Sequence, residues 1–417
     1  MRRLVRWLRS RYDYAFFQVR NEWALLLSVF GVILGAVTIL PSSVGIVLGV
    51  IAFVLGLGAF LRDVHELRRR WADYEFTAIA APFPTDVIKP PSAYPDPLYL
   101  HVPNRGTALV SDAIDQAVAS QSMDARLDEE PYRLPKSLKG SARYLLPKIN
   151  YGRLVFNGKI VGMRGDPLPL GEDSPPPIPL HIARFFDAQC SNEMCTLKVT
   201  HRSGERDFDP RTELLTNANG QLRTLAESNL ADGIGISTIA LTTDSDLVVT
   251  RQTARNIASP RLLAPSGSGS LDPRDLGPAS TGRSREKEPL QGILRRGMER
   301  ELREETGIRQ NEIRHTEVVG FARWLERGAR PEFFGVTELS VSTQDLKEKR
   351  RLTSDERLYT DGTFTLRIDL PELGRELAGG TDLLSAPSLS RTIKEEGSLP
   401  LLLALRAAAL HYVSTVR

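Results

Sequence analysis

The stretch from Trp23 to Leu61 contains no charged residue, and no other feature constrains the fold as strongly. Pro41-Ser42-Ser43 divides it into two apolar segments, Trp23–Leu40 and Val44–Leu61. A helix that crosses a bilayer core needs about 20 apolar residues, with a range of about 17–25. Both segments reach the lower end of that range, so we expect a two-helix transmembrane hairpin. A hairpin buried in a soluble protein is the alternative. A cleaved signal peptide does not fit, because the apolar region is too long and is doubled.

The charges that flank the two segments predict their orientation. Arginines cluster before the first segment and after the second, whereas the turn between the segments has no charge. These residues are Arg2, Arg3, Arg6, Arg9, Arg11, Arg20, Arg62, Arg68, Arg69 and Arg70. Positively charged flanks stay in the cytoplasm. We therefore expect a multi-pass protein of the cell inner membrane with its N- and C-termini cytoplasmic.

The expected partners follow from the same region. Small residues recur there at the four-residue spacing that allows helices to pack closely, within the hairpin or between copies of it, and we expect a homo-oligomer. They are Gly31, Gly35, Gly45, Gly49, Ala52 and Gly56. The net charge of the chain is only +3, and the basic residues gather beside the apolar stretch. This pattern favours inner-membrane lipids as partners, and no nucleic acid polymer is expected.

A chain of 417 residues has room for a soluble domain besides the hairpin. We divide it into a basic cytoplasmic N-terminus (1–22), the transmembrane hairpin (23–61), a juxtamembrane and intermediate region (62–231) and a C-terminal domain (232–417). The intermediate region predicts either a small α+β unit or an N-terminal elaboration of that domain. It contains His181, Cys190, Cys195 and His201. These could bind zinc, but packed free thiols fit their spacing better.

The strongest chemical signal is the sequence Arg300-Glu301-Leu302-Arg303-Glu304-Glu305-Thr306-Gly307-Ile308. Residues three and four apart share a helix face, so Glu301, Glu304 and Glu305 can point into one volume. Three adjacent carboxylates repel one another, and a hard cation with oxygen ligands satisfies them. Mg²⁺ is the expected cation, with Mn²⁺ possible. Gly307 stands where a helix C-terminus favours glycine.

These nine residues resemble the second half of the Nudix box, R-E-(apolar)-x-E-E-x-G-(apolar). The resemblance implies a cytosolic α/β sandwich around a mixed sheet, with the box as a loop, a helix and a loop. It implies a nucleoside diphosphate derivative as ligand and attack of water on phosphorus. It makes Glu301, Glu304 and Glu305 the metal-binding and catalytic glutamates. Arg300 would be the catalytic arginine that orients them by a salt bridge.

The first half of the box departs from the family pattern. The helix that carries the motif is expected to open at Glu288-Pro289, about one turn earlier than in the family. The family's missing glutamate is therefore replaced by Glu288, by Glu299 or by nothing. We interpret Leu271–Lys287 as an insertion that interrupts the Nudix-like box.

The segment before the insertion predicts a phosphate-binding loop. Gly233–Leu241 and Leu247–Thr250 are expected strands, and Pro265-Ser266-Gly267 resembles the turn that precedes the Nudix box. Gly267 and Gly269 could present backbone N–H groups to phosphate oxygens. Arg274 and Arg283, together with Arg285 and Lys287, could clasp the same phosphates. Further strands are expected at Glu317–Leu325 and Pro331–Leu339, and a core helix at Ser398–Val416.

Two functions compete at this point. The order of a hairpin followed by a Nudix-like domain is similar to the two-transmembrane Nudix effectors of bacterial CBASS antiphage systems. That resemblance implies that a cyclic oligonucleotide gates membrane disruption, and the split box favours it. The alternative is an inner-membrane-tethered, Mg²⁺-dependent Nudix hydrolase, which the intact half-box favours. Whether the chain is an enzyme is left open by the sequence.

Overall fold

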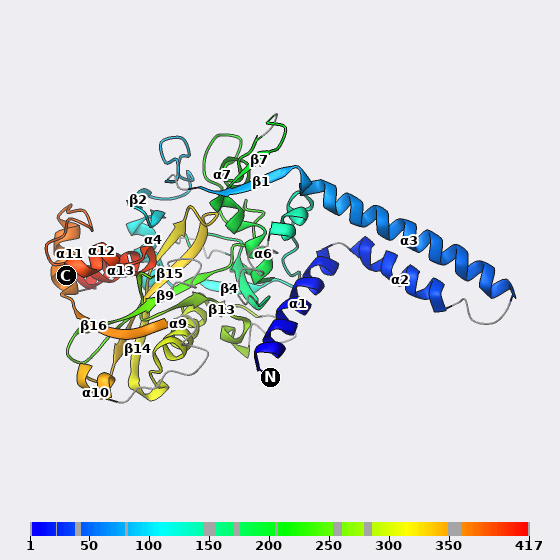
Figure 1. Cartoon of the computed structure of the whole chain (residues 1–417). Helices are drawn as coiled ribbons and strands as arrows, with labels where there is room; N and C mark the ends of the chain where they lie inside the picture. Colours follow the sequence, from blue (N-terminus) through cyan, green and yellow to red (C-terminus); the bar gives the residue numbers. More distant parts are fainter. Residues whose placement is uncertain are drawn as a thin grey trace. The chain divides into compact units, whose positions relative to one another are not determined.

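The computed structural model describes residues 2–21, 23–37, 43–79, 82–144, 156–169, 176–204, 207–252, 261–278, 286–348 and 360–415. These residues form two compact units, each built from separate stretches of the chain. Unit 1 comprises 1–79, 133–158 and 184–213, and unit 2 comprises 80–132, 159–183 and 214–417. The chain is a mixed α/β protein with sheets, as Figure 1 shows.

Unit 1 is mostly helical. Its elements are α1 (Arg2–Asn21), α2 (Trp23–Val37), α3 (Ser43–Ala72), β1 (Tyr74–Ala78), the 3-10 helix η1 (Lys136–Tyr144), α6 (Phe185–Gln189), η2 (Asn192–Thr196), β7 (Leu197–His201), β8 (Asp207–Phe208) and α7 (Pro210–Leu215), which ends at the boundary with unit 2. β1, β7 and β8 form an antiparallel sheet in that order. Phe17 of α1 packs edge-on against Phe186 of α6.

α2 and α3 form a closely packed antiparallel hairpin. A Cβ added to Gly56 would lie 2.8 Å from the backbone nitrogen of Val32, so the helices approach to backbone contact there. Ser28 donates a hydrogen bond to Asp63 across the pair at 2.8 Å. The small residues thus serve packing within the hairpin, as their spacing predicts. The expected turn at 41–43 begins outside the described residues.

The prediction of a transmembrane hairpin is wrong for the part of the chain that the structure describes, because no helix there is long and apolar enough to cross a membrane. α2 has 15 residues, about 22 Å of helix against a bilayer core of about 30 Å. α3 continues past Leu61 through the charged residues Arg62, Asp63 and Glu66 to Ala72. The predicted multi-pass inner-membrane localisation depended on the spanning hairpin and is wrong as well. The effector role stays a prediction.

Unit 2 contains the remaining elements. Its strands are β2 (Leu98–Val102), β3 (Gly106–Val110), β4 (Asp124–Leu127), β5 (Lys159–Met163), β6 (Ile178–Arg184), β9 (Gly235–Leu241), β10 (Asp246–Gln252), β11 (Leu263–Ala264), β12 (Gly267–Ser270), β13 (Glu288–Pro289), β14 (Ile313–Trp324), β15 (Arg330–Leu339) and β16 (Thr360–Arg367). Its helices are α4 (Asp112–Ser120), η3 (Pro273–Asp275), α9 (Leu290–Thr306), η4 (Gln310–Glu312), α10 (Thr343–Glu348), α11 (Leu370–Ala378), α12 (Arg391–Glu396) and α13 (Leu399–Thr415).

A nine-stranded mixed sheet organises unit 2. Seven strands follow the order β11-β10-β9-β15-β14-β3-β2, while β12 pairs with β9 and β16 pairs with β10. β9 and β15 run parallel, with Ser237 opposite Phe334, and the other pairs are antiparallel. A four-stranded sheet, β13-β4-β6-β5, is separate. The strands expected at Gly233–Leu241, Leu247–Thr250, Glu317–Leu325 and Pro331–Leu339 correspond to β9, β10, β14 and β15.

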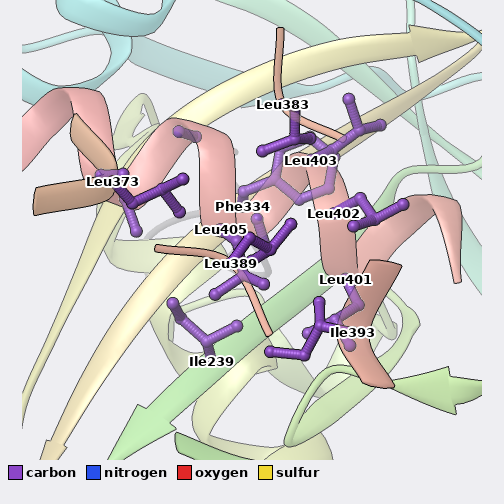
Figure 2. Close-up of a cluster of buried hydrophobic side chains, with 14 of the residues drawn as sticks. Ile239, Phe334, Leu373, Leu383, Leu389, Ile393, Leu401, Leu402, Leu403 and Leu405 are labelled. Carbon is purple, nitrogen blue, oxygen red and sulfur yellow. The ribbon is translucent and has the colours of Figure 1, made fainter. Parts of the chain in front are cut away.

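Helices cover both faces of the large sheet. Ile239 of β9 belongs to the apolar cluster around α13, whereas its neighbour Ala240 belongs to the cluster that includes Leu302 of α9. Successive side chains of a strand point to opposite faces, so α13 and α9 lie on opposite sides. Figure 2 shows the α13 side, where Leu401 to Leu405 meet Phe334 and the leucines of the segment around α11 and α12. α13 (Leu399–Thr415) is thus a core helix, as predicted for Ser398–Val416.

Candidate functional site

Helix α9 carries the carboxylate motif and is held against the sheet by an apolar stripe. Its buried residues include Ile293, Leu294, Met298 and Leu302, which recur at helical spacing. Gly307 ends the helix in the left-handed conformation, with φ 70°, and its N–H bonds to Arg303 O at 3.0 Å. Only glycine adopts that conformation without steric cost, so the Thr-Gly stop of the sequence is explained.

The Gly-Ser segment lies directly beneath α9. Gly267–Ser270 is not a loop but strand β12, paired with β9. A Cβ on Gly267 would lie 2.4 Å from the backbone nitrogen of Leu302, and one on Gly269 would lie 2.2 Å from an oxygen of Glu301. Helix and strand therefore touch through their backbones, and only glycine leaves room for this contact. This contact fixes the Glu301 carboxylate beside β12.

Glu301 and Glu305 are the partly buried carboxylates of the motif. The backbone N–H of Ser268 donates to Glu305 at 3.0 Å, and Arg300 donates to Glu301 at 2.7 Å. Burial raises the pKa of Glu301 to about 7, although Arg300 acts in the opposite direction. Burial raises the pKa of Glu305 well above its ordinary value, and the charge of Glu301 raises it further. The arrangement thus has a deficit of positive charge.

Glu304 is placed differently from the other two. Its side chain is 50% exposed, with one oxygen 3.4 Å from Arg300 and the other 4.0 Å from Arg274. In the part of the chain that the structure describes, no three or more histidine, cysteine, aspartate or glutamate side chains are arranged to hold a metal ion. The motif therefore offers the partly buried pair Glu301 and Glu305, with Glu304 turned towards the two arginines.

Asp275 is a residue of this site that the sequence reasoning missed. It is buried at the end of η3 and accepts two hydrogen bonds from Arg300, at 2.8 Å from Nε and 2.8 Å from Nη2. Burial lowers the pKa of Arg300, but Asp275 and Glu301 more than reverse this and raise it overall. The capping pattern Asp272-Pro273-Arg274-Asp275 is the signal that could have revealed a structured turn here.

The other carboxylates considered as replacements are used elsewhere. Glu288 pairs with Arg296 and accepts the Gly277 N–H at 3.0 Å. Glu299 accepts a hydrogen bond from Gln310 at 3.0 Å in an exposed position. The contacts described for Glu288 and Glu299 do not involve Arg300. Pro289 is the N-cap residue before α9 rather than its first residue.

The basic residues of the insertion separate into three groups. Arg274 lies beside the site, is 67% exposed and pairs with Asp272 at 3.1 Å. Lys287 pairs with Asp124 at 2.7 Å. Arg283 and Arg285 fall outside the described residues, so the prediction that they clasp phosphate stays a prediction.

The two cysteines are packed thiols, which is the interpretation that their sequence spacing favoured over a zinc site. Cys190 and Cys195 are buried thiols that are not joined in a disulfide. His181 approaches the carbonyl oxygen of Ala231 at 2.9 Å, and burial lowers its pKa to about 4. The zinc alternative gains no support from the described residues.

Comparison with known proteins does not assign the chain to a family. No protein-family model matches it, and no curated protein matches it. Among solved structures, it is similar to the crystal structure of DR0079 from Deinococcus radiodurans, with 14% sequence identity and a TM-score of 0.22. That similarity covers 36% of this chain and 75% of DR0079. A TM-score this low carries no argument about fold or function.

Proposed function

We propose that unit 2 binds a nucleoside diphosphate derivative through a divalent cation, Mg²⁺ or Mn²⁺, and hydrolyses its phosphoanhydride bond. The observation that carries this proposal is the pair of partly buried carboxylates, Glu301 and Glu305, beside the backbone of β12. The Nudix-box resemblance of Arg300–Ile308 points to the same chemistry.

The residues present fit a magnesium ion. A buried carboxylate is costly unless a proton or a cation neutralises it. Glu305 is partly buried, accepts a hydrogen bond from the Ser268 N–H and has Glu301 as a negative neighbour. Mg²⁺ is commonly held by one or two protein carboxylates, with water and substrate phosphate completing its shell. Glu301 and Glu305 would hold the ion, which would neutralise the diphosphate and favour ionisation of the attacking water.

The remaining residues orient the carboxylates and line the site. Asp275 holds the Arg300 guanidinium in one orientation, and Arg300 in turn holds Glu301. Arg274 is exposed beside Glu304, and its guanidinium would exchange its contact with Asp272 for a phosphate oxygen of the ligand. Gly267 and Gly269 keep β12 close enough for its backbone to line the site. The chain itself thus supplies orientation, and most of the positive charge comes from the cation.

Turnover tests this proposal. The purified chain should release phosphate or a nucleotide from a nucleoside diphosphate derivative in MgCl₂ and not in EDTA. Glu305→Gln should lower kcat/KM by about 100-fold or more, because loss of a metal ligand removes several kcal/mol of transition-state stabilisation. Glu299→Gln, on the exposed side of the same helix, should leave the rate within about twofold. Turnover that persists in Glu305→Gln would contradict the assignment.

A nucleotide sensor that binds without hydrolysis is a second candidate. The placement of Glu304 favours it, because that carboxylate pairs with arginines instead of joining Glu301 and Glu305. Mg²⁺-dependent binding of nucleoside diphosphate derivatives, without turnover of any substrate in a broad panel, would select the sensor over the hydrolase.

A further inference from the structure

A cavity lies on the face of the large sheet opposite α9. Its volume is about 700 Å³, which is within the range of small-molecule sites. Its wall is formed by α4, β14, the end of α11 and the last turns of α13. Val319 of β14 lines it and belongs to the α13 core cluster, which separates the cavity from the carboxylates of α9.

The charged groups of this cavity are negative. Asp112, Asp115 and Glu317 line it, and among the described lining residues there is no lysine or arginine. Arg406, which lies under the cavity, pairs with both Asp112 and Asp115, the latter at 3.3 Å. One guanidinium therefore balances two carboxylates. Burial raises the pKa of Asp115 to about 7 against the effect of Arg406.

The second negative group stands on β14. Glu317 is 43% exposed and lies 3.3 Å from Nε2 of His411, which balances its charge only when the imidazole is protonated. Asp115 is anchored by the Phe321 N–H at 2.8 Å as well as by Arg406, so it is part of a fixed framework. The carboxylates of the cavity thus stand at two places, Asp112 and Asp115 on α4 and Glu317 on β14.

The rest of the lining combines aliphatic and polar side chains. The aliphatic residues are Ala119, Val319, Ala378, Ala407, Leu410 and Val413, and the polar ones are Gln116, Ser120, Ser414 and Thr415. A free metal ion would gain nothing from the aliphatic part of this wall, and an anion would be repelled by the carboxylates. A ligand that matches both features carries positive charge at its ends and methylene groups between them.

We propose that this cavity, lined by Asp112, Asp115 and Glu317 on an aliphatic wall, is a binding site for a small aliphatic diamine or polyamine. One ammonium group pairs with the α4 carboxylates, and the other pairs with Glu317. The proposal is independent of the chemistry at α9, since its residues belong to other elements.

Isothermal titration of the full chain with cadaverine (1,5-diaminopentane) tests it. Cadaverine should bind, whereas 1,5-pentanediol and glutarate, of the same length but without positive charge, should not. Glu317→Gln and Asp112→Asn should each weaken binding about fivefold, the value of one partly exposed ion pair. The matched control is Glu130→Gln, an exposed carboxylate of unit 2 outside the cavity, which should bind as the wild type does.

A cavity-filling variant separates the cavity from general surface charge. Ala119→Leu keeps every carboxylate and narrows the space, so it should reduce cadaverine binding at least tenfold. Circular dichroism and the urea midpoint would establish that each variant is folded. Absence of cadaverine binding to the wild type, equal binding of pentanediol, or unchanged binding in folded Ala119→Leu and Glu317→Gln would each overturn the proposal.

Discussion

The contact between Asp275 and Arg300 makes a quantitative prediction. The side chains are 3% and 10% exposed, and they are joined by two hydrogen bonds of 2.8 Å. Breaking a buried ion pair by removing one partner costs about 3–5 kcal/mol, because the other charge is left uncompensated. Arg300 keeps Glu301 and the Ser270 carbonyl as acceptors. Because Arg300 keeps these two acceptors, we expect Asp275→Asn to lower the free energy of unfolding by about 2–3 kcal/mol, at or below the lower end of the range for a broken buried ion pair.

A double-mutant cycle isolates the pair. Asp275→Asn, Arg300→Met and the double variant should be compared by urea unfolding. The double variant should be more stable than the sum of the single effects predicts, by about 1–3 kcal/mol, since it leaves no orphaned partner. Asp272→Asn, in the same turn but bonded to the exposed Arg274, should cost only about 0.5–1 kcal/mol. Additivity of the two single substitutions within about 0.5 kcal/mol would refute the reasoning.

Two further predictions concern the same site. Gly267→Ala should lower the free energy of unfolding by at least about 1–3 kcal/mol, because the added Cβ meets the α9 backbone. Gly158→Ala, where an added Cβ has nothing within 4 Å, should change it by less than about 0.5 kcal/mol. Equal effects of the two substitutions in thermal denaturation would contradict the close approach of β12 and α9. In metal-free protein the pKa of Glu301 rises from 4.5 to about 7 on folding. Between these pH values the folded state therefore binds more protons than the unfolded state. The free energy of unfolding should fall as the pH rises from 4.5 to about 7. The loss is at most about 3 kcal/mol, Glu301→Gln should remove it, and excess Mg²⁺ should offset it above pH 7. Urea titrations at pH 5 and pH 8 would measure this, and identical pH slopes in wild type and Glu301→Gln would count against it.

Periodicity and stop signals were sufficient to predict the elements around the motif. β9, β10, β14, β15, α9 and α13 all occur within a few residues of their expected positions, because each has a clear apolar pattern. The Gly-Ser segment was misjudged as a loop. Its glycines serve the contact between β12 and α9, and a close approach of two backbones leaves no trace in local sequence beyond the glycines themselves.

Two other features needed tertiary information. Asp275 is 25 residues before Arg300 in the chain, and only the folded path of η3 brings them together. The apolar stretch 23–61 matched a spanning hairpin in composition, but α2 stops at Val37 and α3 runs on into charged residues. Composition does not fix where a helix ends. The placement of Glu301 and Glu305 on one face of α9 could be predicted, because residues four apart in a helix share a face.

Direct observation of a bound divalent ion tests the central claim. Mn²⁺ can be titrated into the purified chain, and free Mn²⁺ followed by electron paramagnetic resonance. We predict a bound ion that Mg²⁺ displaces, that is lost in Glu301→Gln and in Glu305→Gln, and that is retained in Glu299→Gln. Mn²⁺ that stays entirely free with the wild type, or that binds Glu305→Gln as tightly as the wild type, would contradict the account.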